Sequence, residues 1–313
     1  MLAEHRTIYR EKELHKVTSD QHPNPVQSLL SYPIYERVIS HNCFSVDNQT
    51  RRIETFSSAF VTAISGLVLR ELEPYSEIKS TLAQLKCYLI QNYWTHWRVN
   101  FFDLSEHNFD LDTFICVNLF LLSEKMKWSN RKMLIDTIKN NKCHETGRYK
   151  TWFDRTDNKE NNIDFFVNLN TYVFLNQLSY KDEGLCRYLI TSVNEFLSHG
   201  SHYYRRIEFP LFLIFFYWRH QIVSKQDDVF SEIISTIQSN PSCKEIVNKM
   251  FHFYDQPTFL PNGEMVTYKF PQYFNSSSKS FHSPVLDTII NAYLFCQSHR
   301  SNETSRLSIS TPI

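Results

Sequence analysis

The chain is poor in glycine, with five in 313 residues. Phosphate-binding loops, dinucleotide-binding turns and the nucleophile elbow of hydrolases need glycine at fixed positions, and the sequence contains none of these motifs. β-Sandwiches and β-barrels also use glycine in their many turns. The scarcity therefore argues against glycine-loop enzymes and against an all-β fold.

The chain also lacks an excess of charge, because Lys and Arg together number 33 and so do Asp and Glu. A chain with this balance has no overall electrostatic attraction to nucleic acid or to an anionic membrane. The most apolar run, FPLFLIFFYW at residues 209–218, is half of the roughly 20 residues that a membrane-spanning helix needs. We expect no nucleic-acid partner and no integral membrane segment.

The seven cysteines are an odd number, lie far apart and form no Cys-x-x-Cys pair. Free cysteines within apolar patterns act as small hydrophobic residues, so we expect no disulfide and no structural zinc site. The charged opening sequence MLAEHRTIYREKELHK lacks the apolar core of a secretory signal. These features predict a cytoplasmic protein.

Helical periodicity is abundant, in two alternating kinds of segment. One kind is apolar on nearly every side, which is typical of a helix that is buried all round. The other has a single apolar stripe, which is typical of a helix that covers a core and faces water. Segments of the first kind are residues 56–72, 110–124, 163–178, 208–223 and 284–296. Segments of the second kind are residues 76–93, 182–198 and 227–239.

Buried helices that alternate with covering helices, at a step of about fifty residues, indicate repeated helical hairpins. An open solenoid has short, uniform loops, whereas here long and aromatic-rich loops precede the buried helices. These loops are residues 94–109, 143–162, 200–207 and 252–283. We therefore predict an all-α fold, a closed α/α toroid with an inner and an outer ring made of five to six helical hairpins. The expected parts are a helical N-terminal extension at residues 1–50, the toroid at 51–300 and a disordered tail at 301–313.

Two of the apolar segments begin alike. HNFDLDTFICVNLFLL at 107–122 and NNIDFFVNLNTYVFL at 161–175 align when one is shifted by 52 positions. The aligned pairs include Asp112 with Asp164, Phe114 with Phe166 and Asn118 with Asn170. An acid at the start of an apolar helix either caps free backbone N–H groups or acts chemically at the mouth of the toroid. The sequence leaves both interpretations open.

Four segments carry a resemblance to a known family: FDLDTF, GRYKTWF, NNIDFFVNLNTYVFL and FHSPVLDTIINAYLF. They resemble the terpenoid cyclase and protein prenyltransferase superfamily, and within it the bacterial prenyltransferase-like and squalene-cyclase-like members. The resemblance covers residues 50 to 300. It implies the α/α-toroid fold and an apolar, isoprenoid-like small molecule as the substrate.

The same resemblance implies acid-initiated cyclisation or isomerisation. The D-x-D-D motif of class II cyclases falls on Asp110-Leu111-Asp112-Thr113, so Asp112 would protonate the substrate, with Asp110 and Asp164 as its partners. A carboxylic acid stays protonated in an apolar site, and aromatic faces stabilise a carbocation by about 0.5–2 kcal/mol per contact. Thr113 departs from the motif, which has Asp at that position.

The expected substrate-binding residues lie in the inner helices and the loops before them. They are Trp97, Phe114, Asn118, Trp152, Phe153, Phe166, Asn170, Tyr172, Tyr204 and Arg205. The protein prenyltransferases hold zinc with an Asp, Cys and His set that has no match here, so we expect no metal and no cofactor. Mg²⁺ would enter only with a diphosphate substrate, which an Arg such as Arg205 would contact.

A second hypothesis belongs to a different class: a non-catalytic toroid that binds a lipid-like ligand or a partner protein through its aromatic loops. Thr113 in the fourth motif position and the presence of one helical domain favour it. The doubled acid and the abundance of aromatics, with 25 Phe and 17 Tyr, favour the cyclase-like enzyme.

Overall fold

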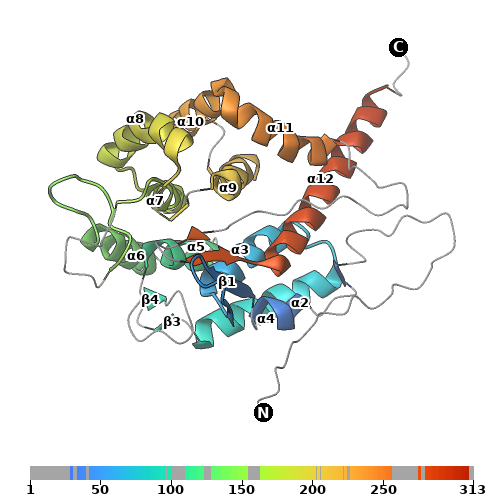
Figure 1. Ribbon diagram of the computed structural model, residues 1–313, viewed down its shortest axis with the longest axis horizontal. Coiled ribbons are helices and arrows are strands. Elements are labelled where there is room, and N and C mark those ends of the chain that lie inside the picture. Colours follow the sequence, from blue (N-terminus) through green and yellow to red (C-terminus); the bar gives the residue numbers. More distant parts are fainter. Residues whose placement is uncertain are drawn as a thin grey trace.

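The computed structural model describes most of the chain between residues 29 and 309. The described residues are 29–30, 34–39, 42–92, 94–95, 98–99, 110–122, 128–153, 163–201, 203–204, 206–220, 222–223, 226–255, 274–275 and 279–309. Helices α2 to α12 make up 69% of them (Figure 1). The protein is therefore mostly helical, as predicted.

Five of the described helices are buried on nearly every side. They are α3 (Ala59–Arg70), α5 (Leu111–Leu121), α7 (Phe165–Gln177), α9 (Glu208–Arg219) and α12 (Pro284–Ile309). This holds over most of the length of the first four and over residues 289–294 of the last. In α3, every residue from Ala59 to Leu69 is buried. Full burial of one large aliphatic side chain contributes about 1.5–3 kcal/mol, so these helices supply most of the core. Their starting points agree with the segments that were expected to be apolar all round.

The other long helices bury one face each. They are α4 (Ser76–Asn92), α6 (Trp128–Asn140), α8 (Glu183–His199), α10 (Asp228–Ser239) and α11 (Pro241–Asp255). In α4 the buried residues are Ile78, Leu82, Leu85 and Leu89, the spacing that one face of a helix requires. A short helix, α2 (Ile34–Ile39), contacts α3 and α4. The sequence pattern did not predict α6 or α11, whereas α2 lies within residues 1–50, which were expected to be helical.

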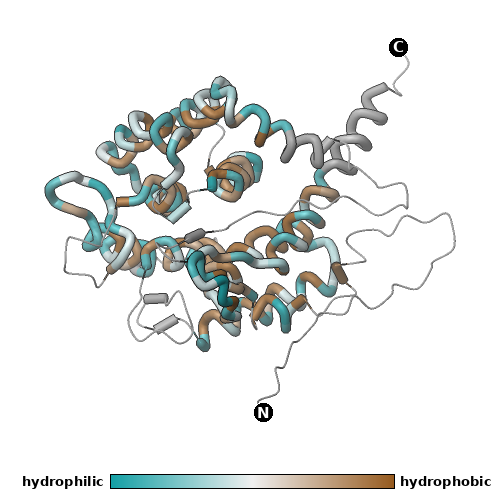
Figure 2. The backbone as a smooth tube through the Cα atoms, in the orientation of Figure 1, coloured by the Kyte–Doolittle hydropathy of each residue, from teal (hydrophilic) through white to brown (hydrophobic). Residues whose placement is uncertain are grey.

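The buried helices pack on one another, and the covering helices lie outside them (Figure 1). α3 contacts both α5 and α12, and α5 contacts α7. Aromatic rings of α9 pack against those of two neighbouring helices. The ring centroids of Phe209 and Phe60 of α3 are 6.3 Å apart, and those of Phe212 and Tyr293 of α12 are 6.2 Å apart. α8 contacts α10, α10 contacts α11, and α11 contacts α12. Figure 2 shows hydrophobic residues over most of α9 and a mixture of hydrophobic and hydrophilic residues along α8 and α10.

Side-chain caps set where many of these helices begin. Ser58 caps α3, and the other caps are Asp110 for α5, Asp164 for α7, Asp182 for α8 and Asp227 for α10. In each case the side-chain oxygen accepts a hydrogen bond from a backbone N–H in the first turn, which contributes about 1 kcal/mol. Asp at a helix start is thus a recurrent structural device in this chain.

A four-stranded antiparallel sheet is also present, which the predicted all-α fold did not include. It consists of β1 (Cys43–Asp47), β2 (Ile53–Phe56), β5 (Phe274–Asn275) and β6 (Lys279–His282), in the order β2-β1-β6-β5. The central strands, β1 and β6, pair Phe44 with His282, so they connect two segments that are far apart in the sequence. A separate hairpin is formed by β3 (Trp94–Thr95) and β4 (Arg98–Val99).

The expected boundaries differ from the structure at both ends. β1 lies within residues 1–50, expected to be a helical extension, yet it pairs with β2 and β6 and so belongs to the main fold. α12 continues to Ile309, into the segment 301–313 that was expected to be a disordered tail. Residues 1–28 and 310–313 lie outside the described residues. None of the helices in the described ranges combines the length and the apolar character needed to cross a membrane.

Candidate functional site

Two neighbouring carboxyl groups are buried where α5 begins. Asp110 is the N-cap, and its Oδ1 accepts a hydrogen bond from the Thr113 backbone N–H at 2.7 Å. Asp112 follows two residues later, and its carboxyl accepts hydrogen bonds from residues outside α5. Asp110 is 4% exposed and Asp112 is 5% exposed, so both acids are removed from water. The start of a helix is the end that favours negative charge.

The Asp112 carboxyl joins α5 to two other elements. Its Oδ1 accepts a hydrogen bond from Asn170 Nδ2 of α7 at 2.6 Å. Its Oδ2 accepts a hydrogen bond from the hydroxyl of Tyr204, which lies in the segment before α9. The Phe166 ring packs edge-on against Tyr204, with centroids 4.7 Å apart. The structure thus brings together four residues that were expected at the site: Asp112, Phe166, Asn170 and Tyr204.

Burial raises the pKa of both acids. It raises the pKa of Asp112 to about 6, although the hydrogen bonds from Tyr204 and Asn170 lower it. It raises the pKa of Asp110 to about 7, against the hydrogen bond from Thr113 and with a further rise from the charge of Asp112. Burial therefore keeps a proton on Asp110 in a large fraction of molecules close to neutral pH.

Three polar atoms of this cluster have no partner within hydrogen-bond distance among the described residues. They are Asp110 Oδ2, Thr113 Oγ1 and Asn170 Oδ1. A buried polar atom that lacks a partner costs about 1–3 kcal/mol, and folded proteins keep few of them. These atoms are the ones that a bound polar group or an ordered water would satisfy.

Asp164 serves as a helix cap. Its Oδ1 accepts hydrogen bonds from the backbone N–H groups of Phe166 and Val167, at 2.8 and 3.2 Å. Its Oδ2 accepts one from the Tyr203 backbone N–H at 3.3 Å. Its charge nevertheless raises the pKa of Asp112. Both Asp164 oxygens are therefore used by backbone donors, in agreement with the capping interpretation.

The caps correct the register of the internal repeat. The sequence alignment, shifted by 52, placed Asp112 on Asp164. In the structure the equivalent positions are the caps Asp110 and Asp164, a shift of 54. In that register Asp112 corresponds to Phe166. The Asp112 carboxyl is therefore particular to α5 and is not a repeated helix cap.

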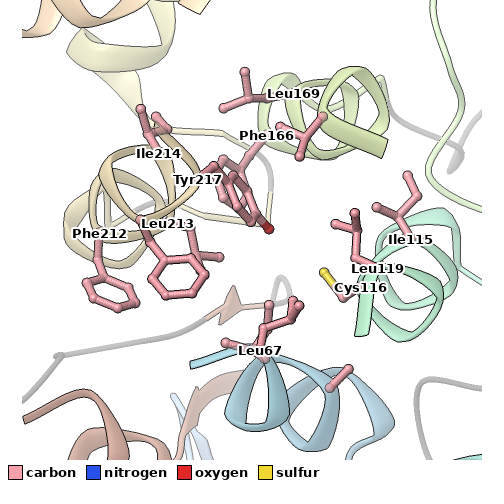
Figure 3. Packing of buried hydrophobic residues seen from close by; sticks show 14 of the residues in the cluster. Leu67, Ile115, Cys116, Leu119, Phe166, Leu169, Phe212, Leu213, Ile214 and Tyr217 are labelled. Atoms are coloured by element: carbon pink, nitrogen blue, oxygen red, sulfur yellow. The ribbon is translucent and has the colours of Figure 1, made fainter. Parts of the chain in front are cut away.

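Side chains from α3, α5, α7 and α9 point toward a common centre (Figure 3). There the Cys116 thiol of α5 faces the Tyr217 hydroxyl of α9 (Figure 3). Burial raises the pKa of both groups, and the nearby Asp112 adds to the rise. The thiol is therefore neutral and unsuited to act as a nucleophile.

Neither Cys116 nor Tyr217 was predicted as a site residue. Cys116 lies four residues, one helical turn, after Asp112, and this spacing puts both on one face of α5. That spacing is a signal that could have found the thiol. Tyr217 sits inside a uniformly apolar run, which contains no comparable signal.

The loop aromatics Trp152 and Phe153 lie near the start of α5. The backbone N–H of Leu111 donates to the Thr151 carbonyl at 2.7 Å, which holds this loop against the helix. The Phe153 ring lies 5.5 Å from that of Phe114. Trp152 Nε1 donates to the Tyr203 hydroxyl at 2.7 Å. The described residues of the segments before α7 and α9 thus meet at the same end of α5.

Two other expected binding residues, Tyr172 and Asn118, form their hydrogen bonds away from the acid cluster. The Tyr172 hydroxyl donates to Asp227 Oδ2 at the start of the outer helix α10, and its ring stacks on Phe230. Asn118 Nδ2 donates to the Phe114 carbonyl of its own helix at 2.8 Å. Tyr172 and Asn118 therefore have packing partners outside the acid cluster. Trp97 and Arg205 lie outside the described residues.

In the part of the chain that the structure describes, no group of three or more His, Cys, Asp or Glu side chains is arranged to hold a metal ion. A comparison of the sequence with models of known protein families gives no match, and neither does a comparison with curated protein sequences. The geometry of the acid cluster is therefore the basis for a functional proposal.

Proposed function

We propose that the chain is an α/α toroid that binds an isoprenoid-like apolar substrate and starts a cyclisation or isomerisation by proton transfer from the Asp110–Asp112 pair. The inner ring would consist of the five buried helices, and the outer ring of α4, α6, α8, α10 and α11. The contact of α12 with α3 supports closure of the ring. The resemblance of four sequence segments to terpenoid cyclases supports the same architecture.

The observation that carries the proposal is the unequal use of the two carboxyls. Asp112 has both oxygens held by neutral donors, Asn170 and Tyr204. Asp110 uses one oxygen as a cap, while its Oδ2 has no hydrogen-bond partner among the described residues. With its pKa raised to about 7, Asp110 retains a proton in a large fraction of molecules at neutral pH. We assign the donated proton to the pair, with Asp110 Oδ2 as the presenting atom and Asp112 as its charged neighbour.

The surroundings of the pair suit an apolar substrate with developing positive charge. The rings of Phe166 and Tyr204 lie beside Asp112, and those of Phe114 and Phe153 lie on the same helix end. Aromatic faces attract a cation by about 0.5–2 kcal/mol each. A site that excludes water also protects a reactive carbocation from hydrolysis.

The charge of the cluster favours a neutral substrate over a diphosphate. The charged groups that shift the pKa values of Asp110 and Asp112 are other carboxyls. No Lys or Arg of the described residues is among these groups. An anionic headgroup would be repelled here, because like charges repel strongly where water is excluded. We therefore expect polyprenyl alkenes, alcohols or epoxides to be the substrates, with no requirement for Mg²⁺.

The test is product formation from linear polyprenyl alkenes, alcohols, epoxides and diphosphates, each with and without Mg²⁺. Asp110→Asn and Asp112→Asn keep the size of the side chain, and at position 110 Asn caps the helix as well as Asp does. Each should lower turnover by about a hundredfold to ten-thousandfold and leave the fold intact. Asp164→Asn changes an equally buried cap outside the pair and should keep most of the activity. Full activity in both pair variants would rule out the pair as the acid.

A non-catalytic toroid has support of its own from the same contacts. Asp112 ties α5 to α7 through Asn170 and to the segment before α9 through Tyr204. Buried hydrogen-bond networks of this kind specify how helices pack. The chain would then bind a lipid-like ligand or a partner protein through its aromatic loops. A wild-type protein that is inert on every substrate, together with a strongly destabilised Asp112→Asn variant, would favour this function.

A further inference from the structure

Strand β2 forms one edge of the four-stranded sheet. In the described part of the chain it pairs only with β1. Its first residue, Ile53, is 64% exposed, more than any other large hydrophobic residue in the described ranges. An edge strand with an exposed apolar side chain is a template for pairing with another strand.

The backbone groups of Ile53 and Thr55 face this open edge. The Asp47 N–H donates to the Arg52 carbonyl at 2.9 Å, so Arg52 bonds toward β1. Ladder hydrogen bonds alternate in direction along an antiparallel strand, and Glu54, opposite Ser45, also bonds toward β1. The N–H and C=O groups of Ile53 and Thr55 therefore point outward.

We propose that β2 pairs antiparallel with β2 of a second copy of this chain, about a twofold axis at Ile53. The two four-stranded sheets become one continuous sheet. Ile53 then lies opposite Ile53 of the second copy, and the two residues exchange both of their backbone hydrogen bonds. Arg52 lies opposite Glu54 of the second copy, and the twofold axis repeats this pair. The surface is self-complementary, as a twofold dimer requires.

The charges support pairing with a second copy. Charged residues on short edge strands usually prevent edge-to-edge association. Here Arg52 and Glu54 stand on either side of Ile53, so the twofold axis brings each against the opposite charge, and unlike charges directly opposite in a sheet attract. Within one chain, Arg52 Nε already lies 3.6 Å from Glu54 Oε1, and the two side chains are 77% and 42% exposed. Both remain accessible to a second copy.

The pairing is short, so the dimer belongs among the weak and transient interfaces. Sedimentation velocity of the full chain from micromolar to millimolar concentration should show a reversible monomer–dimer equilibrium. Arg52→Glu and Glu54→Arg each place like charges opposite one another and should weaken dimerisation by about tenfold or more. The double variant, Arg52→Glu with Glu54→Arg, restores opposite charges and should restore the dimer.

A further variant and a folding control complete the test. Ile53→Lys puts two like charges directly across the twofold axis and should leave a monomer. Circular dichroism and the melting temperature of each variant show whether it keeps the fold. A wild-type protein that stays monomeric over the whole range overturns the proposal. So does a dimer that resists the single charge reversals, or one that the double variant fails to restore.

Discussion

At the scale of single residues, the Asp110–Asp112 pair couples protonation to stability. Burial raises the pKa of Asp110 to about 7, well above the value of about 3.9 for an unfolded Asp. Between these values the folded chain holds a proton that the unfolded chain has released. The contribution of this group to stability is therefore complete below about pH 4 and is lost as the pH rises through about 7.

We expect Asp110→Asn to remove this loss, because Asn keeps the cap and carries no charge. The variant should be more stable than the wild type at about pH 8, by about 1 kcal/mol or more, the value of one unit of pKa. At about pH 4 the two proteins should be nearly equal. Urea unfolding at several pH values measures the difference.

Asp182, the cap of α8, provides a control whose contribution to stability changes with pH in the opposite direction. Burial raises the pKa of Asp182, but hydrogen bonds from Lys142 and Tyr149 outweigh it, and the pKa is lowered. Asp182 therefore stabilises the fold above its unfolded pKa, and Asp182→Asn should lose stability at neutral pH and approach the wild type in acid. The same pH trend in both variants would contradict the assignment of the two acids.

Several residues of the acid cluster could be predicted from sequence, because the Asp and Asn spacing of an apolar helix start is a local pattern. Which of these residues would hydrogen-bond to one another could not be predicted. Tyr204 reaches Asp112 from 92 residues away, and no periodicity connects the two. The repeat register failed for a related reason: matching similar letters aligned Asp112 with a cap, whereas the cap geometry aligns Asp110 with Asp164.

At the scale of elements, one of the few glycines allows two buried helices to approach closely. A Cβ atom on Gly66 of α3 would lie 2.5 Å from Cζ of Phe120 in α5. Gly66→Ala should therefore destabilise the protein by about 1–3 kcal/mol through overpacking, although Ala is the better helix former by about 1 kcal/mol. Thermal unfolding measures the change.

Gly184 of α8 is the matched control. A Cβ atom there would meet Asp182 Oδ1 at 3.4 Å, an ordinary contact. Gly184→Ala should be neutral or stabilising by up to about 1 kcal/mol. If both alanine variants shift the melting temperature in the same direction, the close approach of α3 and α5 at Gly66 is not the cause.

The end of α7 carries a residue that glycine would suit better. Ser179 has a φ of 56°, and the Tyr180 N–H donates to the Leu175 carbonyl at 2.9 Å, the pattern of a Schellman cap. Ser179→Gly should stabilise the protein by about 0.5–1 kcal/mol, because a side chain disfavours this backbone region. Ser179→Ala retains a Cβ atom and should bring no such gain in the melting temperature.

The buried helices were predictable because their apolar character on every side is visible in a short window. The sheet was not, for a physical reason. β1 and β6 pair across more than two hundred residues, and their strands are too short to stand out by alternation. The β1–β2 turn also carried no glycine signal, because Arg51, with a φ of 60°, occupies a position where glycine is usual.

At the scale of the whole molecule, α12 connects the last part of the helical array to the first. It contacts α3 as well as α11. Tyr293 of α12 is hydrogen-bonded to Nε2 of His220, just after α9. Nδ1 of the same imidazole lies 2.7 Å from Glu71 Oε2, just after α3. One series of polar contacts therefore joins α3, α9 and α12.

Deletion of residues 284–313 tests whether this connection closes a ring. In a closed ring each inner helix is stabilised from both sides, so loss of α12 should speed amide hydrogen exchange in α3 as much as in α11. In an open array, stability is a sum over neighbouring units, and the strong contact of α3 with α5 should preserve most of its protection. Deletion of 310–313 alone, beyond the end of α12, is the control and should leave exchange unchanged. Unaltered protection of α3 after the larger deletion would mean that the contact between α3 and α12 does not stabilise α3. This result would contradict a closed toroid.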